Sequence, residues 1–250
     1  MTFIQVVISG IIQGVTEFLP ISSSGHLVIL HKLMSMTEPD ILFDIFLHLG
    51  TVVAILIVFG KEAMEIILHK RRVLLLILLG SIVTFACVVF FIKDIEAAFN
   101  DIRMVGFMFI ITGIWLMLGN LMRFGTEGLT GVKAIIIGLA QAIAALPGIS
   151  RSGATISTGL FLGLDGQTSA KFSFLLSIPA VIGAFIFKLK AQHGLGFPEL
   201  HPNYFIGFLV SCVIGVISLK LLLRVLYRNR FHWFAAYCIA LGIAVLLFLK

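Results

Sequence analysis

The chain has 250 residues, of which 60% are hydrophobic and only 12% are charged, and its mean hydropathy is +1.14. This composition excludes a soluble domain and indicates a membrane protein. The apolar runs have the length of helices, and none alternates as a barrel strand does. The net charge of +6 does not suggest a nucleic-acid partner, because the basic residues lie between apolar runs, where they signal topology and contact membrane lipids. We therefore expect an all-α integral membrane protein with a single membrane domain, residues 1–250.

In chain order, two interrupted stretches each precede three continuous apolar ones. Residues 3–35 and 134–164 are broken by proline, glycine and serine, and each of their halves is too short to span a bilayer. Such halves predict re-entrant helix–loop–helix hairpins, whose loops must be buried in protein or line a wet cavity. The six predicted transmembrane helices are 42–60, 73–92, 104–122, 172–190, 204–222 and 232–249.

The two interrupted stretches are related by a shift of 128 positions. This shift lays IIQGVTEFLPISSSG (11–25) over LAQAIAALPGISRSG (139–153). Residues 1–125 and 126–250 would then be two repeats, each with one hairpin and three spans. Because three crossings are an odd number, the second repeat is inverted relative to the first, and both loops meet near the midplane.

Charge placement predicts the orientation. If the loop 61–72 lies on the inner face of the membrane, ten basic residues lie on that face and six on the outer face, which favours this orientation. Both termini and the entrance to the first hairpin would then lie on the outer face. The inner set is Lys61, Lys70, Arg71, Arg72, Arg123, Lys133, Lys171, Arg224, Arg228 and Arg230. The outer set is Lys32, Lys93, Arg103, Lys188, Lys190 and Lys250.

Glu17 and Arg151 are the charges placed deepest in the two hairpins. An ionisable residue inside the membrane is by default a functional hypothesis, and the alternative is a purely structural ion pair that holds the hairpins together. Gln13 lies four residues before Glu17, so the two share one helix face. Pro20 ends that helix, and the SSSG segment supplies an N-cap for a second helix that we expect to begin near His26.

The second loop repeats this arrangement. Ser150, Ser152 and Gly153 precede a helix, and Thr155 lies four residues after Arg151. Helix N-termini favour anions, and a guanidinium binds phosphate through two parallel hydrogen bonds. The two loops together predict an oxyanion site, although each loop taken alone also fits serine-rich turns that only cap helices.

Phosphate chemistry needs a nucleophile and a base, and the first hairpin contains both. Ser22, Ser23, Ser24 and His26 are the candidate nucleophiles, and Glu17 is the candidate base. The residues do not rank the serines against the histidine. His48 and Asp44 are also four residues apart, and there we expect a structural hydrogen bond. The three cysteines lie singly in apolar runs, so we expect small buried side chains and neither a disulfide nor a metal site.

Three stretches carry a resemblance to a known family: QGVTEFLPISSSGHL (13–27), LPGISRSGATISTGLFLGL (146–164) and FSFLLSIPAVIGA (172–184). They closely resemble undecaprenyl-diphosphate phosphatases of the BacA/UppP type. The resemblance implies a multi-pass bacterial plasma-membrane enzyme with six spans and two re-entrant hairpins, open to the outer face. Such an enzyme removes the terminal phosphate of C55 isoprenyl diphosphate, recycles the lipid carrier for peptidoglycan synthesis and confers bacitracin resistance. A homodimer is compatible with the resemblance.

Carried over position by position, the resemblance implies catalytic roles for Glu17, Ser23, His26 and Arg151. The expected phosphate-binding positions are Gln13, Ser22, Ser24, Ser150, Ser152, Gly153 and Thr155. The resemblance also implies a divalent cation, Mg²⁺ or Ca²⁺, with Glu17 and Gln13 as candidate ligands. Gln13 stands where some relatives have glutamate, which leaves open whether the cation is held by this pair or mainly by substrate phosphates and water.

A lipid-phosphate transporter or flippase is the competing class, because inverted repeats with broken helices are typical of transporters. Such a carrier would use the same anion-binding loops. Glu17 argues against it, since a carboxylate repels the anion that would be carried.

Overall fold

The computed structural model describes residues 1–36, 41–121, 125–193, 201–226 and 232–249. Over these residues all the regular secondary structure is helical, and turns and irregular segments join the helices. The helices are α1 (Phe3–Thr16), α2 (Ser23–Leu33), α3 (Ile41–His69), α4 (Arg71–Phe90), α5 (Ile92–Phe99), α6 (Ile102–Leu121), α7 (Gly131–Ile143), α8 (Arg151–Phe161), α9 (Gly166–His193), α10 (Pro202–Leu226) and α11 (His232–Phe248).

Five helices of the described chain, α3, α4, α6, α9 and α10, are long and apolar enough to cross a membrane. They coincide with five of the six predicted spans, and a helical multi-pass membrane protein is confirmed at that level. The remaining predicted span, 232–249, is α11, which has 17 residues and belongs with the shorter apolar helices. Helix α5 was not predicted; it buries Ile95 and Ala98 on one face and carries Asp94 in its first turn.

Both interrupted stretches consist of two short helices. The first helix ends at Thr16, before Pro20, and the second begins at Ser23. The predicted start near His26 is therefore wrong by three residues. The reason is the cap: the Ser22 hydroxyl accepts the backbone N–H of Gly25 at 3.3 Å, so α2 begins directly after Ser22.

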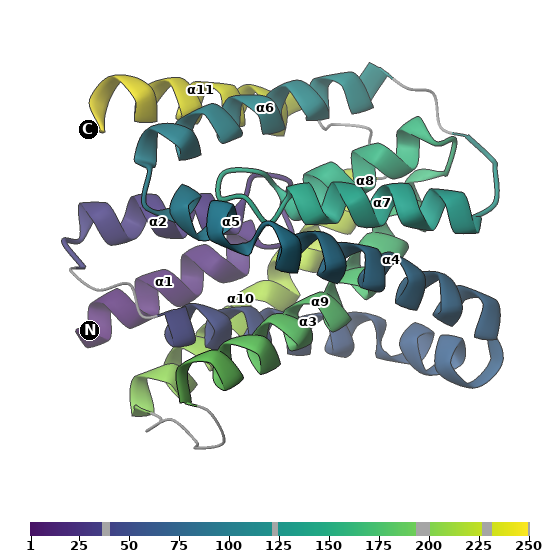
Figure 1. The fold of residues 1–250 in the computed structure, drawn as a ribbon, viewed down its shortest axis with the longest axis horizontal. Helices are drawn as coiled ribbons and strands as arrows, with labels where there is room; N and C mark the ends of the chain where they lie inside the picture. Colours follow the sequence, from purple (N-terminus) through teal and green to yellow (C-terminus); the bar gives the residue numbers. More distant parts are fainter. Residues whose placement is uncertain (37–40, 122–124, 194–200, 227–231, 250) are drawn as a thin grey trace.

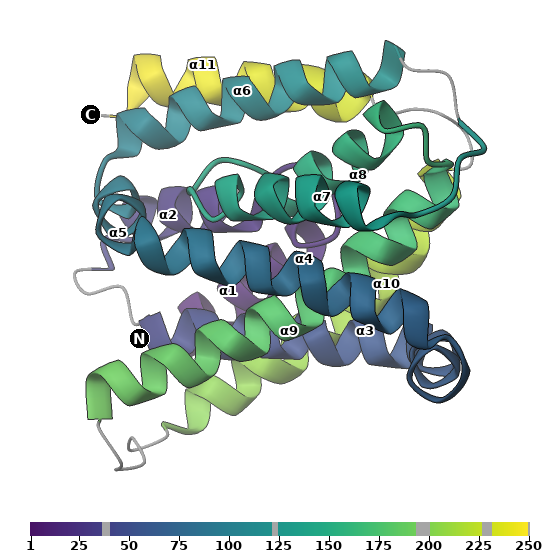
Figure 2. The same ribbon diagram turned by 45° about the vertical axis from the view of Figure 1, so that its right-hand side comes forward.

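The two helix pairs enter the molecule from opposite ends (Figures 1 and 2). Helices α1 and α2 have their outer ends on the side where both termini lie, and α7 and α8 have theirs on the other side. After each pair the chain runs back and forth along the molecule in three further long helices, α3, α4 and α6 and then α9, α10 and α11. The loops inside the two pairs consequently lie in the interior of the bundle.

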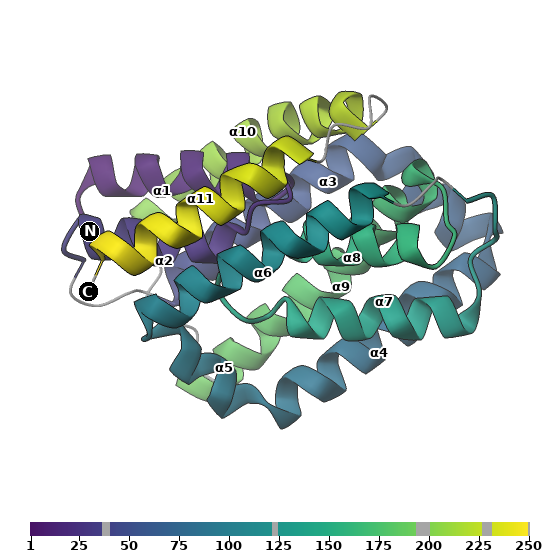
Figure 3. The same cartoon turned by 90° about the horizontal axis from the view of Figure 1, so that it is seen from above.

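Close helix packing is made at glycines. Seen from above, α6 and α11 run side by side across the molecule (Figure 3), where a Cβ added at Gly113 would lie 2.8 Å from the Ala235 carbonyl oxygen. A Cβ at Gly14 of α1 would lie 2.8 Å from the Ser211 oxygen of α10, and one at Gly138 of α7 would lie 2.5 Å from the Gly80 oxygen of α4. Small residues allow apolar helices to approach closely where lipid gives no hydrophobic drive.

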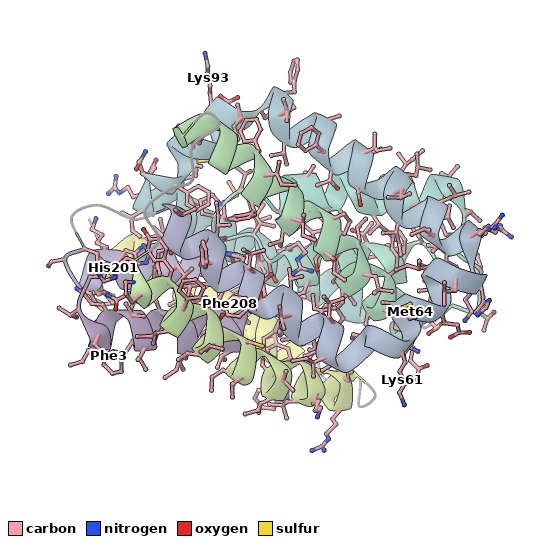
Figure 4. The ribbon with its side chains drawn as sticks, turned by 90° about the horizontal axis from the view of Figure 1, so that it is seen from below. Phe3, Lys61, Met64, Lys93, His201 and Phe208 are labelled. Atoms are coloured by element: carbon pink, nitrogen blue, oxygen red, sulfur yellow. The ribbon has the colours of Figure 1, made fainter. Side chains whose placement is uncertain are left out.

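Figure 4 identifies the two ends of the molecule by labelled residues. Phe3 and His201 lie at one end, and Lys61 and Met64 lie at the opposite end. Between the ends the outer helix faces are apolar, for example at Ile82, which is exposed in this chain and suits contact with lipid tails. Four residues used for the expected orientation lie outside the described residues, namely Arg123, Arg228, Arg230 and Lys250.

We predict that Gly138→Ala destabilises the protein. The added methyl group would meet the Gly80 backbone, which cannot move aside without separating α4 from α7. Overpacking of this kind costs about 1–3 kcal/mol, so the thermal unfolding midpoint in detergent should fall. The matched control is Gly60→Ala on α3, where an added Cβ meets nothing within 4 Å; equal effects at both positions would contradict the packing argument.

Candidate functional site

The carboxylate of Glu17 is the centre of a buried polar cluster. Its Oε2 accepts hydrogen bonds from the Ser23 hydroxyl at 2.5 Å and from the Gln13 amide at 3.0 Å. Its Oε1 accepts from the Arg151 guanidinium, which forms an ion pair with it across 134 positions of sequence. The side chains of Glu17 and Arg151 are only 6% and 16% exposed. The predicted meeting of the two deepest charges is therefore observed, and Gln13 acts from the same helix face as expected.

Glu17 is the C-cap residue of α1, and the chain turns after it. Phe18 is inaccessible and meets the ring of Phe174 edge to face at a centroid distance of 5.8 Å. This anchor holds the loop against α9. Glu17 therefore directly precedes a residue that is fixed by apolar packing.

The two interior loops contact each other directly. The Gly148 N–H of the second loop donates to the Ser22 hydroxyl at 3.2 Å, and the Ser152 hydroxyl donates to the Leu19 carbonyl at 3.2 Å. Gly25 faces Gly148 so closely that an added Cβ would lie 2.9 Å from the Gly148 Cα. These contacts bring Ser23 and Arg151, from opposite ends of the molecule, to one point.

Side chains of neighbouring helices satisfy the loop backbone, as non-helical chain at membrane depth requires. Thr112 of α6 accepts the N–H of Ser150 at 3.1 Å and donates to the carbonyl of Gly148 at 2.9 Å. The thiol of Cys238 on α11 donates to the Pro20 carbonyl at 3.7 Å. This buried free cysteine therefore has a hydrogen-bonding partner as well as the predicted apolar surroundings.

Two helices begin at the cluster with the same cap. Ser22 and Ser150 precede α2 and α8, and each hydroxyl accepts the N–H of the glycine three residues later, at 3.3 Å and 3.1 Å. Ser24 and Ser152 lie 3.4 Å and 3.3 Å from these capping hydroxyls. Both helix N-termini therefore direct their positive dipole ends toward the Glu17–Arg151 region, which favours an anion there.

Arg151 is positioned by residues of α9 as well as by its own helix. Its guanidinium donates to the Ser173 carbonyl at 3.5 Å, and the Ser173 hydroxyl lies 2.5 Å from the Thr155 hydroxyl. Thr155, expected beside Arg151, donates to the Arg151 carbonyl at 2.7 Å. The sequence interpretation assigned no role to Ser173, although this residue lies in FSFLLSIPAVIGA (172–184), one of the stretches that carry the family resemblance, four residues before Ser177.

His26 lies apart from the charged cluster. Its ring contacts the Ser22 carbonyl, the Tyr237 hydroxyl and the Phe109 ring. Within the described part of the chain, no hydrogen bond or ion pair joins the ring to Glu17, Ser23 or Arg151. Of the two candidate nucleophile types, only Ser23 is hydrogen-bonded to the candidate base.

His48 is a second neighbour of Glu17 that the sequence interpretation did not place there. Its Nε2 lies 3.6 Å from Glu17 Oε2, and its Nδ1 is 2.7 Å from the backbone carbonyl of Asp44. The expected structural hydrogen bond between His48 and Asp44 is therefore present, but it uses the backbone oxygen. The Asp44 carboxylate lies 3.6 Å from His31 of α2 instead. A histidine on the inward face of the first span was the signal for this contact.

The residues present do not fit a divalent metal held by protein alone. Among the described residues no group of three or more histidine, cysteine, aspartate or glutamate side chains is placed to hold a metal ion. Both oxygens of Glu17 already accept hydrogen bonds, and Gln13 offers one buried amide oxygen without a hydrogen-bond partner. A hard cation prefers six or more oxygens, so this donor set is too small.

The apolar helices, with a carboxylate, a hydroxyl and a guanidinium in contact at the interior loops, place this chain among helical multi-pass membrane proteins. The chain belongs to the family described as bacitracin resistance protein BacA, which it matches over residues 6–244. It is 41% identical over 263 residues to an undecaprenyl-diphosphatase of Desulfosudis oleivorans, covering 96% of each chain. It is also 41% identical over 254 residues to one of Carboxydothermus hydrogenoformans, covering 98% of this chain and 97% of that one. A third, from Halothermothrix orenii, is 38% identical over 99% of this chain and 98% of its own length.

We predict strong energetic coupling between Glu17 and Arg151. Removing one member of a buried pair leaves an uncompensated charge and costs about 3–5 kcal/mol, so Arg151→Met should lower the free energy of unfolding in detergent by about that amount. The double variant Glu17→Gln with Arg151→Met has neither charge. Its loss in free energy of unfolding should therefore be smaller than the sum of the losses in the two single variants. Additive effects would show that the pair does not act as a unit.

Proposed function

We propose that this chain is an undecaprenyl-diphosphatase. It hydrolyses the phosphoric anhydride of C55 isoprenyl diphosphate, gives undecaprenyl phosphate and inorganic phosphate, and so returns the lipid carrier to peptidoglycan synthesis. Membership of the BacA family and the names of relatives about 40% identical over nearly the full length support this function. The single observation that carries it to particular atoms is the 2.5 Å hydrogen bond from the Ser23 hydroxyl to the Glu17 carboxylate.

Ser23 is the nucleophile in this mechanism and Glu17 is the base. The Ser23 oxygen forms a bond to the terminal phosphorus, its proton passes to Glu17, and the bond from that phosphorus to the bridging oxygen breaks. Isoprenyl monophosphate leaves with the bridging oxygen. Water then attacks the phosphorus of the phosphoserine, and the bond between phosphorus and the serine oxygen breaks. Inorganic phosphate departs with the oxygen and protons of that water, and Ser23 recovers its proton from Glu17, which is again a carboxylate. This pairing of nucleophile and base within hydrogen-bonding distance is what an activated serine requires.

Arg151 and the starts of α2 and α8 stabilise the phosphoryl oxygens. Before reaction the guanidinium is paired with Glu17. When Glu17 takes the serine proton it becomes neutral, so the charge of Arg151 is then balanced by the phosphoryl group alone. Preorganised donors aimed at developing charge are an effective form of transition-state stabilisation in phosphoryl transfer.

The proposed membrane arrangement has six spans and two re-entrant hairpins in an inverted repeat, with the active site open to the outer face. The matching caps at Ser22 and Ser150 and the entry of the two hairpins from opposite ends support this arrangement. Helix α11 is the sixth span; its 17 residues rise about 25 Å, near the lower limit for crossing. The sequence count of ten basic residues on the predicted side of the loop 61–72, against six on the other side, supports an inner position for the Lys61 end.

We predict that Ser23→Ala lowers phosphate release from farnesyl or undecaprenyl diphosphate at least roughly a thousandfold in detergent. The reason is loss of the attacking oxygen, while the Glu17–Arg151 pair remains. Ser81→Ala is the matched control, because its hydroxyl donates only to the carbonyl of the preceding turn of α4. The assay measures released phosphate without a membrane gradient, so activity of the purified wild-type protein separates an enzyme from a pure transporter.

Near-native activity of Ser23→Ala would contradict attack by serine and make His26 the candidate nucleophile. Activity that survives Arg151→Ala would contradict the phosphate site itself. Absence of phosphate release by the wild-type protein would favour the transporter.

The divalent cation expected from the family resemblance is, in this proposal, held by substrate phosphates and water. We predict that Gln13→Ala lowers kcat, because Glu17 loses one hydrogen-bond donor, but leaves the Mg²⁺ concentration for half-maximal activity unchanged. Titration of Mg²⁺ into EDTA-treated protein measures this concentration. An increase of about tenfold or more, equivalent to at least 1.4 kcal/mol of cation binding, would instead make Gln13 a direct ligand.

A further inference from the structure

Both ring nitrogens of His26 are engaged by groups that fix their hydrogens. Nδ1 lies 2.7 Å from the Ser22 carbonyl oxygen, and Nε2 lies 2.8 Å from the Tyr237 hydroxyl. A carbonyl can only accept, so Nδ1 carries the hydrogen. In the neutral ring Nε2 then has the lone pair, and the Tyr237 hydroxyl donates to it. The two partners together select one tautomer of His26.

Aromatic packing holds this ring in place. The ring of Phe109 on α6 meets the imidazole edge to face, with 5.2 Å between the ring centroids. The ring of Tyr237 on α11 is nearly parallel to the imidazole, with 2° between the ring planes and 5.8 Å between the centroids. Phe109 is fully buried, and it also contacts the position where Gly25 would carry a side chain. The ring therefore has little freedom to turn toward a substrate.

His26 holds the backbone carbonyl of Ser22, the residue that precedes the proposed nucleophile Ser23. Ser22 has φ 66° and ψ 98°, a left-handed conformation that is unfavourable for a residue other than glycine. Its carbonyl accepts both the side chain and the backbone N–H of His26, the latter at 3.3 Å. Its hydroxyl caps α2 and accepts the Gly148 N–H of the other hairpin. The orientation of Ser22 decides where Ser23 points.

We propose that Tyr237 is a positioning residue for the phosphatase reaction. By donating to Nε2, Tyr237 keeps His26 in the Nδ1–H form. His26 in turn holds the Ser22 carbonyl, and this keeps the Ser23 hydroxyl within hydrogen-bonding distance of the Glu17 carboxylate. His26 then orients the nucleophile and does not itself attack, since its only lone pair is used by Tyr237. The inference rests on the proposed function through the role of Ser23.

Three variants test the inference by kcat and KM for phosphate release. His26→Asn keeps an N–H close to the Nδ1 position, able to donate to Ser22, but has no counterpart of Nε2; His26→Ala has neither. We expect His26→Ala to lower kcat by about 10- to 100-fold and His26→Asn to recover most of that loss. Tyr237→Phe removes one oxygen atom and should lower kcat about fivefold with KM unchanged.

The decisive comparison is the double variant. Tyr237→Phe should have no further effect in the His26→Asn protein, because Tyr237 acts only through Nε2. Tyr204→Phe is the matched control, because it also removes one tyrosine hydroxyl, here from the aromatic cluster of α3 and α10. The activity of the Tyr204→Phe protein should be near that of the wild type. An equal effect of Tyr237→Phe in both backgrounds, or His26→Asn as inactive as His26→Ala, would overturn the inference.

The ¹⁵N spectrum of histidine-labelled protein provides a readout that does not depend on activity. The His26 signals, assigned by their absence in His26→Asn, should report the Nδ1–H tautomer in the wild type and a tautomer or protonation mixture in Tyr237→Phe. A mixture already present in the wild type would overturn the positioning role. If the tautomer is as expected but the wild-type protein releases no phosphate, the proposed function fails while the Tyr237–His26 contact stands.

Discussion

Two opposite charges, Glu17 from one hairpin and Arg151 from the other, lie in contact inside a bundle of apolar helices. A lone buried charge would be costly, so each is stable there only while the other is present. The pair also joins two short helix pairs that do not cross the molecule themselves. The interior loops also contact each other through the Gly148 N–H and the Ser22 hydroxyl, and the Ser23 hydroxyl donates to the Glu17 carboxylate of the pair. The same interaction that permits polar residues in this position thus assembles the site.

In the proposed mechanism the two loops have different chemical roles. Under the 128-residue shift Ser23 corresponds to Arg151, and Glu17 corresponds to Ala145. In the proposed mechanism, the same position after equivalent helix caps therefore supplies the nucleophile in one hairpin and the phosphate-binding cation in the other. Only the first hairpin has a carboxylate to accept the serine proton. Entry from opposite ends lets these two positions face each other, which a single hairpin could not achieve.

Hydropathy and the internal shift predicted the broad design from sequence. Five spans, the two interrupted stretches and the convergence of Glu17, Gln13 and Arg151 follow from apolar run length, helix periodicity and the cost of buried charge. The start of α2 was misplaced because the capping serine of three consecutive serines cannot be chosen without coordinates. Helix α5 was missed because its charged residues resemble a loop.

Residues that support the site from other helices could not be predicted. No contact with the site was predicted for Ser173, His48 or Tyr237, because such contacts depend on how the apolar spans that contain them pack against the hairpins. For the same reason the sequence left Ser23 and His26 unranked, although they lie three residues apart on one helix. Their hydrogen bonds separate them: Ser23 donates to the carboxylate, whereas His26 is held between a carbonyl and a phenol.

Identification of the residue that carries the phosphoryl group would test the central claim most directly. The protein would be mixed with terminally ³²P-labelled farnesyl diphosphate, denatured rapidly at neutral pH so that phosphohistidine also survives, and digested for mass spectrometry. The account predicts label on Ser23, formed during turnover and absent when Glu17 is replaced by glutamine. Label on His26, or release of phosphate with no labelled protein at any time, would contradict it.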